Sequence, residues 1–217
     1  MSPKRWEFML AYSQEVFGQE PASMRSLKDR ATAQGIPDIA ITADVGRLLK
    51  LLVSTTPAKL VIEVGTLGGY SALWMAQALA HGGRLICVEI NKDYADFARQ
   101  RFHEFGVDDR ISIRVGAGKD VLEKLAHELG PDSVDAVFLD AVKVEYCDYW
   151  KIARPMLKRG GLLLADNVYG SDDWWIDEES KTTRVAVDKF NRMVAGDADF
   201  TTVALPIRQG LLVARRH

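Results

Sequence analysis

Two apolar runs of this chain end in side chains that can bind a hard cation. The run FLDAVK reaches Asp140 and then Lys143, and the run LLLADN ends in Asp166 and Asn167. Burying carboxylates is costly unless a positive charge compensates them. If both runs are neighbouring strands of a parallel sheet, their ends converge at the edge where such sheets bind ligands. Two carboxylates and an amide oxygen there suit Mg²⁺, Mn²⁺ or Ca²⁺, whereas either acid alone could be a helix cap or a loop residue.

A glycine-rich segment, EVGTLGGYS at 63–71, follows another apolar run and opens a helix-forming one. Glycines there let the backbone turn tightly and approach a ligand. The segment is neither G-x-G-x-x-G nor a Walker loop, and Glu63 precedes it, so we expect a cationic or hydroxyl-rich ligand and not a nucleotide phosphate. A glycine-rich turn without any ligand is the alternative.

Two later strand ends extend this potential ligand site. Glu89 ends the run LICVE roughly 20 residues after the glycine segment, a place where an acid commonly binds ribose hydroxyls. A solvent-facing helix cap is the alternative for Glu89. The next run leads into VGAGKD, where Gly116, Ala117 and Gly118 leave room for a flat base.

The elements that must position these residues alternate along the chain. Three helices are expected first, the second over 23–34 and the third over 43–54 with Thr42 as its cap. After Pro57, strands are expected within 59–65, 84–90, 111–116, 134–140, 161–167, 201–207 and 210–216. Helix-forming runs separate all but the last two, which predicts an α/β fold with a mostly parallel sheet and helices on both faces. The last two runs are joined by few residues and predict an antiparallel hairpin.

Length and composition limit the organisation further. The 217 residues suffice for one sizeable core, and 47% apolar with 27% charged residues is ordinary for a globular protein. The formal net charge of −2 argues against a nucleic-acid partner. Cys87 and Cys147 make neither a disulfide framework nor a zinc site. The N-terminus lacks a signal-peptide pattern and no run approaches the ~20 apolar residues that span a membrane, so we expect a cytoplasmic location.

The segments VIEVGTLGGYSALWMAQAL, VEIN, FLDAVK and LLLADNV, in this order, resemble the cation-dependent class I O-methyltransferases. This family contains catechol O-methyltransferase and the caffeoyl-CoA type, and the resemblance covers the chain from about Ile41 to its end. It implies S-adenosylmethionine (SAM) as methyl donor, a divalent cation (Mg²⁺, or Mn²⁺ or Ca²⁺) and a Rossmann-like, seven-stranded sheet with a reversed final hairpin. We expect a single domain over 1–217, in which helices within 1–56 cover the site and 57–217 form the SAM-binding core.

The resemblance also assigns the methionine end of the donor site. Glu63, Gly65 and Thr66 are expected to line it, with Tyr70 packed nearby. Ser71 is expected to hydrogen-bond the donor carboxylate near a helix N-terminus, where backbone N–H groups favour an anion.

The rest of the implied donor site comes from other segments. Glu89 is expected to hold the ribose, and Ala117 beside Gly118 borders the adenine. Ile41 and Thr42, ahead of the third helix, cover the donor from the N-terminal side.

The resemblance makes Asp140, Asp166 and Asn167 the metal ligands, with Asp140 also beside the donor, and Lys143 the catalytic residue. A phenolic hydroxyl has a pKa near ~10, and binding to a divalent cation lowers that pKa. A neighbouring cation also favours neutral lysine, which can then accept the proton; a solvated surface lysine is the alternative for Lys143. Many bacterial and plant members have an acid where this chain has Val142, but catechol O-methyltransferase lacks it too, so metal binding is not put in doubt.

The loop YGSDDWWIDEES, at 169–180, is expected to form a wall of the acceptor site. Trp174 and Trp175 either stack on an aromatic acceptor or make an ordinary packing or subunit contact. The acids of the loop disfavour a polyanionic substrate such as a CoA ester, so we expect a small catechol-like or polyphenolic acceptor. The N-terminal helices either cover the site or form the interface of a homodimer.

Two other classes of protein share parts of this pattern. One is an NAD-dependent oxidoreductase of similar α/β layout, against which the missing third Rossmann glycine and the paired acidic strand ends argue. The other is a non-catalytic SAM-binding protein, against which the intact set of Asp140, Lys143, Asp166 and Asn167 argues.

Overall fold

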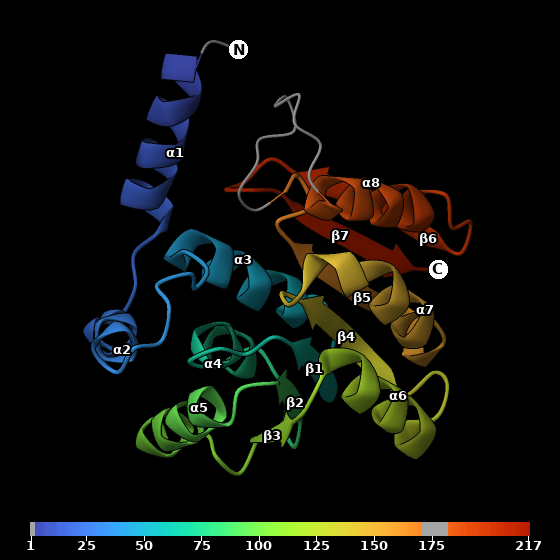
Figure 1. Cartoon of the computed structure of the whole chain (residues 1–217), viewed down its shortest axis with the longest axis horizontal. Coiled ribbons are helices and arrows are strands. Elements are labelled where there is room, and N and C mark those ends of the chain that lie inside the picture. The colour runs from blue at the N-terminus through green and yellow to red at the C-terminus, as the bar shows by residue number, and fades with distance from the viewer. Residues whose placement is uncertain (1–2, 171–181) are drawn as a thin grey trace.

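The computed structural model describes residues 3–170 and 182–217, and within these residues one sheet has seven strands in the order β3-β2-β1-β4-β5-β7-β6 (Figure 1). Strands β1 to β5 pair in parallel, and β7 runs antiparallel to both β5 and β6. The predicted α/β fold with its antiparallel C-terminal hairpin is therefore confirmed. The strands are β1 (Leu60–Val64), β2 (Arg84–Glu89), β3 (Ile111–Val115), β4 (Val134–Leu139), β5 (Leu157–Asp166), β6 (Phe200–Leu205) and β7 (Leu211–Arg216).

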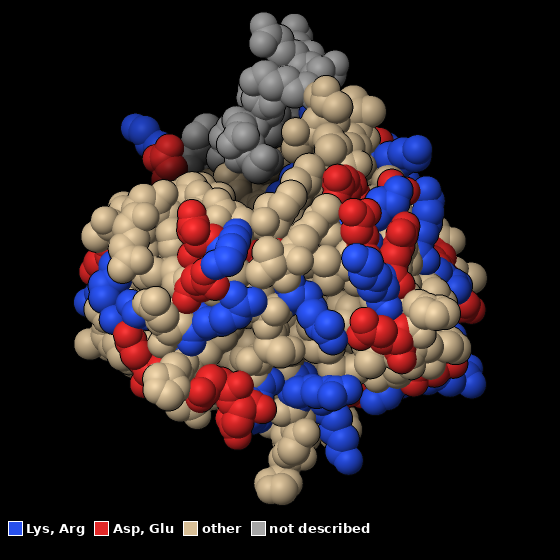
Figure 2. All heavy atoms as spheres, turned by 60° about the horizontal axis from the view of Figure 1, so that its bottom comes forward, with Lys and Arg blue, Asp and Glu red and all other residues tan. Residues whose placement is uncertain are grey.

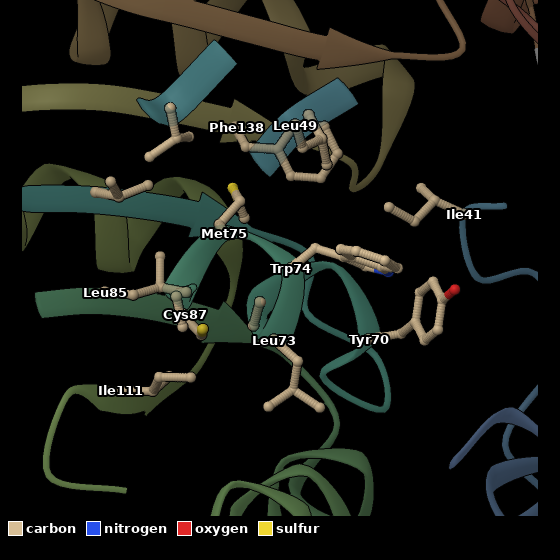
Figure 3. Close-up of a cluster of buried hydrophobic side chains, with 14 of the residues drawn as sticks. Ile41, Leu49, Tyr70, Leu73, Trp74, Met75, Leu85, Cys87, Ile111 and Phe138 are labelled. Carbon is tan, nitrogen blue, oxygen red and sulfur yellow. The ribbon is translucent and has the colours of Figure 1, made fainter. Parts of the chain in front are cut away.

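Helices cover both faces of the sheet because successive strand residues point to opposite sides. Val61 and Phe138 belong to one buried apolar cluster, whereas their neighbours Ile62 and Leu139 belong to the other. Figure 3 shows part of the first cluster, with side chains of the sheet meeting those of the helices. The first cluster includes α2 (Ala22–Ala33), α3 (Ala43–Ser54), α4 (Tyr70–Ala76) and α5 (Lys92–Glu104), and the second includes α6 (Gly118–Leu129), α7 (Tyr146–Met156) and α8 (Thr182–Ala195).

Two element boundaries show what tertiary packing adds to the local pattern. Helix α3 has the expected bounds, but Thr42 at its N-cap makes no side-chain capping hydrogen bond. Strand β5 begins at Leu157, before the expected start at 161, because Leu157 pairs with Val134 of β4 across an irregular register.

Helix α1 (Pro3–Phe17) extends away from the sheet and packs against α3 (Figure 1). Five apolar side chains along this helix are exposed, namely Phe8, Met9, Tyr12, Val16 and Phe17. These side chains are exposed because the helix projects beyond the core.

One face of the surface reflects the near-neutral charge balance of the chain. On the face shown in Figure 2, acidic and basic side chains are interspersed and no large region of one sign is seen. Within the described ranges, no helix combines the length and apolar character needed to cross a membrane.

Candidate active site

A cavity of about 620 Å³ opens beyond the carboxyl ends of strands β1 to β5. The chain contributes to its wall directly after each strand, at 64–68, 88–90, 116–118, 140–145 and 167. Helix α2, the segment 37–41 and the turn between β6 and β7 supply further lining residues. This is the edge at which open α/β sheets bind their ligands.

Most of the predicted site residues line this cavity. Thr42, Glu63 and Asp166 do not, and both acids are fully buried, each with 0% exposure. Trp174, Trp175 and the acids of the loop around them lie outside the described residues. The predicted residues in the wall are Ile41, Gly65, Thr66, Tyr70, Ser71, Glu89, Ala117, Gly118, Asp140, Lys143 and Asn167.

Gly65 brings the turn after β1 against the end of β4. Its φ is 94°, and a Cβ atom at this position would lie 2.2 Å from the carbonyl oxygen of Asp140. A side chain is therefore excluded both by the left-handed backbone and by the neighbouring strand. The close contact at Gly65 brings the end of β1, which carries predicted donor-site residues, against the end of β4, which carries the predicted metal ligand Asp140.

Glu63 lies beneath this turn as a buried acid. The hydroxyl groups of Thr66 and Ser71 donate hydrogen bonds to its carboxylate. Burial raises the pKa of Glu63 to about 7, because desolvation outweighs these hydrogen bonds. A hydroxyl has only one proton, and in this arrangement the proton of Ser71 is directed to Glu63; the hydrogen bond from Ser71 to the donor carboxylate stays a prediction.

Glu89 is held in a fixed orientation at the cavity wall. Its Oε2 accepts a hydrogen bond from the Leu67 N–H at 2.8 Å, and its Oε1 accepts one from the Asn91 N–H at 2.9 Å. Each carboxylate oxygen has a second lone pair, which can accept a hydrogen bond from a ligand hydroxyl. The two backbone contacts pre-position the carboxylate for that task.

The ends of β4 and β5 bring the predicted metal set together. Leu139 pairs with Ala165 in parallel register, so the residues that follow, Asp140 and Asp166, leave neighbouring strands at the same edge. Adjacent strands lie about 4.8 Å apart. Asn167 comes next with a φ of 58°, a left-handed conformation that asparagine tolerates better than most residues.

Positive groups surround these two acids. Lys143 Nζ lies 2.8 Å from Asp140 Oδ1 and 2.8 Å from the Tyr146 hydroxyl oxygen. Arg208 Nη1 lies 3.3 Å from Asp166 Oδ2. Burial and the charge of Asp140 raise the pKa of Asp166 to about 7, although Arg208 and Lys143 act in the opposite direction.

The donor set fits a small divalent cation. Asp166 Oδ1 is buried and makes no hydrogen bond within the described structure, and the nearby Asp140 disfavours its ionisation. A cation between the two carboxylates would satisfy that oxygen and relieve the repulsion. No cluster of three or more His, Cys, Asp or Glu suited to a metal occurs among residues 3–170 and 182–217, so the third protein ligand would be the amide of Asn167.

Sequence reasoning did not identify several residues of this site. Tyr146 carried a local signal, since it stands three residues after Lys143 and one turn of helix brings the two together. Arg208 and Gln209 carried no such local signal, because they come from the β6–β7 turn, which is distant in the sequence. The Asn167 amide donates a hydrogen bond to Gln209 Oε1 at 2.6 Å. Lys28 likewise reaches the cavity from α2, far away in the sequence.

Comparisons with known proteins agree over almost the whole chain. A family model described as O-methyltransferase matches residues 14–217. The chain is 32% identical over 198 residues to the catechol O-methyltransferase of Niastella koreensis, covering 91% of this chain and 89% of that protein. It is similar to the structure of an O-methyltransferase from Bacillus cereus in complex with S-adenosylhomocysteine (SAH), with a TM-score of 0.87, 25% identity and 99% of each chain covered. It is also similar to TomG of Streptomyces achromogenes, an O-methyltransferase involved in tomaymycin synthesis and solved with SAM, with a TM-score of 0.86, 28% identity and 100% and 99% of the two chains covered.

Proposed function

The chain belongs to the O-methyltransferase family, and on that premise we propose that it transfers the methyl group of SAM to a hydroxyl of a catechol-like or polyphenolic molecule with the help of a divalent cation. The observation that carries the proposal is the meeting of Asp140, Lys143, Asp166 and Asn167 at one sheet edge, beside a cavity large enough for two small ligands.

The proposed donor site lies along the ends of β1, β2 and β3. Glu89 accepts hydrogen bonds from the ribose hydroxyls, with its carboxylate already oriented by two backbone N–H groups. Ala117 and Gly118 border the adenine, and the turn at 65–71 holds the methionine end. Ile41, which is 2% exposed, lies in the segment that covers the donor.

The proposed metal site consists of Asp140, Asp166 and Asn167. When bound, Mg²⁺, Mn²⁺ or Ca²⁺ supplies Lewis-acid chemistry that lowers the pKa of an acceptor hydroxyl. Its support in this chain is the buried, unpartnered Asp166 Oδ1 and the raised pKa of that carboxyl group.

Lys143 is proposed to accept the acceptor's hydroxyl proton at Nζ as a neutral amine, the form that a divalent cation at the neighbouring site would favour. The hydroxyl of Tyr146 and the carboxylate of Asp140 orient this nitrogen, each at 2.8 Å. The deprotonated oxygen then forms a bond to the donor methyl carbon as the carbon–sulfur bond breaks, leaving SAH. Holding both reactants in one cavity supplies the remaining rate enhancement.

Helices within 1–56 are proposed to cover the site, and α1 also to form a homodimer interface. The support for the dimer is the exposed row of Phe8, Tyr12 and Val16, spaced four residues apart along a helix that projects from the core. Replacement of Phe8 and Tyr12 by serine should shift a dimer to monomer in light scattering; a wild-type protein already monomeric at micromolar concentration would refute this part.

An acceptor screen with labelled SAM tests the proposed reaction. We expect methylation of one or more catechols with added Mg²⁺ and a large loss of activity with EDTA. Labelled product from no phenolic acceptor, together with no binding of SAH in calorimetry, would refute it. Binding of NAD in place of SAH would favour the oxidoreductase, and SAH binding without turnover on any acceptor would favour a non-catalytic protein.

A further inference from the structure

Lys28 of α2 places a cation at the end of the cavity formed by the glycine turn. Its Nζ lies 4.5 Å from the centre of the Tyr70 ring and 3.7 Å from Glu20 Oε1. The Glu20 side chain is 8% exposed and accepts a hydrogen bond from the Tyr70 hydroxyl. Figure 3 shows the Tyr70 ring at the edge of the apolar cluster, beside Trp74 and on the side where Ile41 lies. The ammonium group is thus held at the cavity wall by one acid and one aromatic face.

The contact with Glu20 does not consume the donors of Lys28. A separation of 3.7 Å is too long for an N–H···O hydrogen bond, so Glu20 attracts the ammonium group without taking its protons. The Lys28 side chain is 25% exposed, and Lys28 lines the cavity.

Several donors of the glycine turn are already committed within the protein. The hydroxyl protons of Thr66 and Ser71 go to Glu63. The N–H of Leu67 goes to Glu89, and that of Gly69 goes to the Thr66 carbonyl oxygen. A carboxylate entering this end of the cavity therefore finds few uncommitted side-chain donors on the glycine turn, and a charged donor binds it more strongly than a neutral one.

The other cations of the described cavity wall stand at the opposite side of the site. Lys143 and Arg208 pair with Asp140 and Asp166, at the ends of β4 and β5. Helix α2, in contrast, lies against the glycine turn: a Cβ atom on Gly68 would lie 3.6 Å from that of Ala31, one helical turn after Lys28.

We propose that Lys28 is the counter-ion of the donor's α-carboxylate and so a specificity determinant for the amino-acid part of the donor. This inference rests on the proposed function, since it presumes that the cavity takes SAM. It assigns to α2 a binding role besides covering the site.

Calorimetry with two ligands tests this inference in the full chain. SAH carries the carboxylate, whereas 5′-methylthioadenosine has the adenosine and thioether parts but no amino-acid part. Lys28→Gln should weaken SAH binding about tenfold, the size of one charge-assisted hydrogen bond, and change methylthioadenosine binding by less than about twofold. Lys28→Arg should retain most of the SAH affinity.

Arg25→Gln is the matched control. Arg25 Nε also lies 3.7 Å from Glu20 Oε1, but its side chain is 66% exposed and it does not line the cavity. Its loss alters the charge around Glu20 as the loss of Lys28 does, yet should leave both ligands unaffected.

Three results would overturn the inference: unchanged SAH binding in Lys28→Gln, an equal loss for both ligands in that variant, or the same loss for SAH in Arg25→Gln. If Lys28→Gln does not fold, the wild type still decides, because SAH affinity should fall with added salt relative to methylthioadenosine, and equal salt responses would refute the ion pair. A wild-type protein that binds neither ligand would instead refute the proposed function.

Discussion

Replacing Glu63 by glutamine should change the stability of the protein in a pH-dependent way. The carboxyl group is fully buried, and burial raises its pKa from 4.5 to about 7 despite hydrogen bonds from Ser71 and Thr66. Between these pH values the folded protein holds a proton that the unfolded chain has already released. The free energy of unfolding therefore falls as the pH rises through this window and is constant above it.

The size of the effect follows from the two pKa values. Each pH unit within the window contributes about 1.4 kcal/mol, so the interval from 4.5 to about 7 amounts to about 3 kcal/mol. Glutamine at position 63 does not titrate. The unfolding free energy of Glu63→Gln minus that of the wild type should consequently rise by about 3 kcal/mol between about pH 4 and about pH 8.

Urea unfolding followed by tryptophan fluorescence, repeated across this pH range, measures that difference. Titrations of groups common to both proteins cancel in this difference. The different hydrogen bonding of the amide adds an offset that does not depend on pH, so it leaves the predicted rise unchanged. A difference that stays constant with pH, or that falls, would refute the description of Glu63 as a buried group that is ionised only at a cost.

Three further predictions concern ligand binding and turnover. Asp166→Asn should weaken Mg²⁺ binding in the SAH complex at least about tenfold, because it removes one of the two charges of the proposed metal site; equal Mg²⁺ affinity in calorimetry would remove Asp166 from it. Lys143→Met should lower kcat by about 10²-fold or more and change the Kd for SAH little. Lys151→Met should leave both unchanged, because it breaks only an exposed ion pair, in which Lys151 lies 3.0 Å from Asp148 and follows it by three residues as Lys143 follows Asp140. Normal turnover in Lys143→Met would mean that another base is used. Glu89→Gln should weaken SAH binding about tenfold or more, because an amide cannot accept from both the Leu67 and Asn91 N–H groups, and an unaltered Kd would contradict the ribose assignment.

The layered fold could be predicted because its signals are local. The continuous apolar run in KLVIEVG, the glycine after this first strand and the short link that contains Gly210 are each readable within a few residues. The convergence of Asp140 and Asp166 also followed, since the carboxyl ends of neighbouring parallel strands share one edge.

The partners of the site residues were decided only by tertiary structure. Arg208 reaches Asp166 from 42 residues away, Lys28 reaches the cavity from an N-terminal helix, and the proton of Ser71 is directed to Glu63. The physical reason is the same in each case: an apolar pattern specifies which side of an element avoids water, but the group that covers it, and the atom that receives each proton, depend on where the rest of the chain is packed.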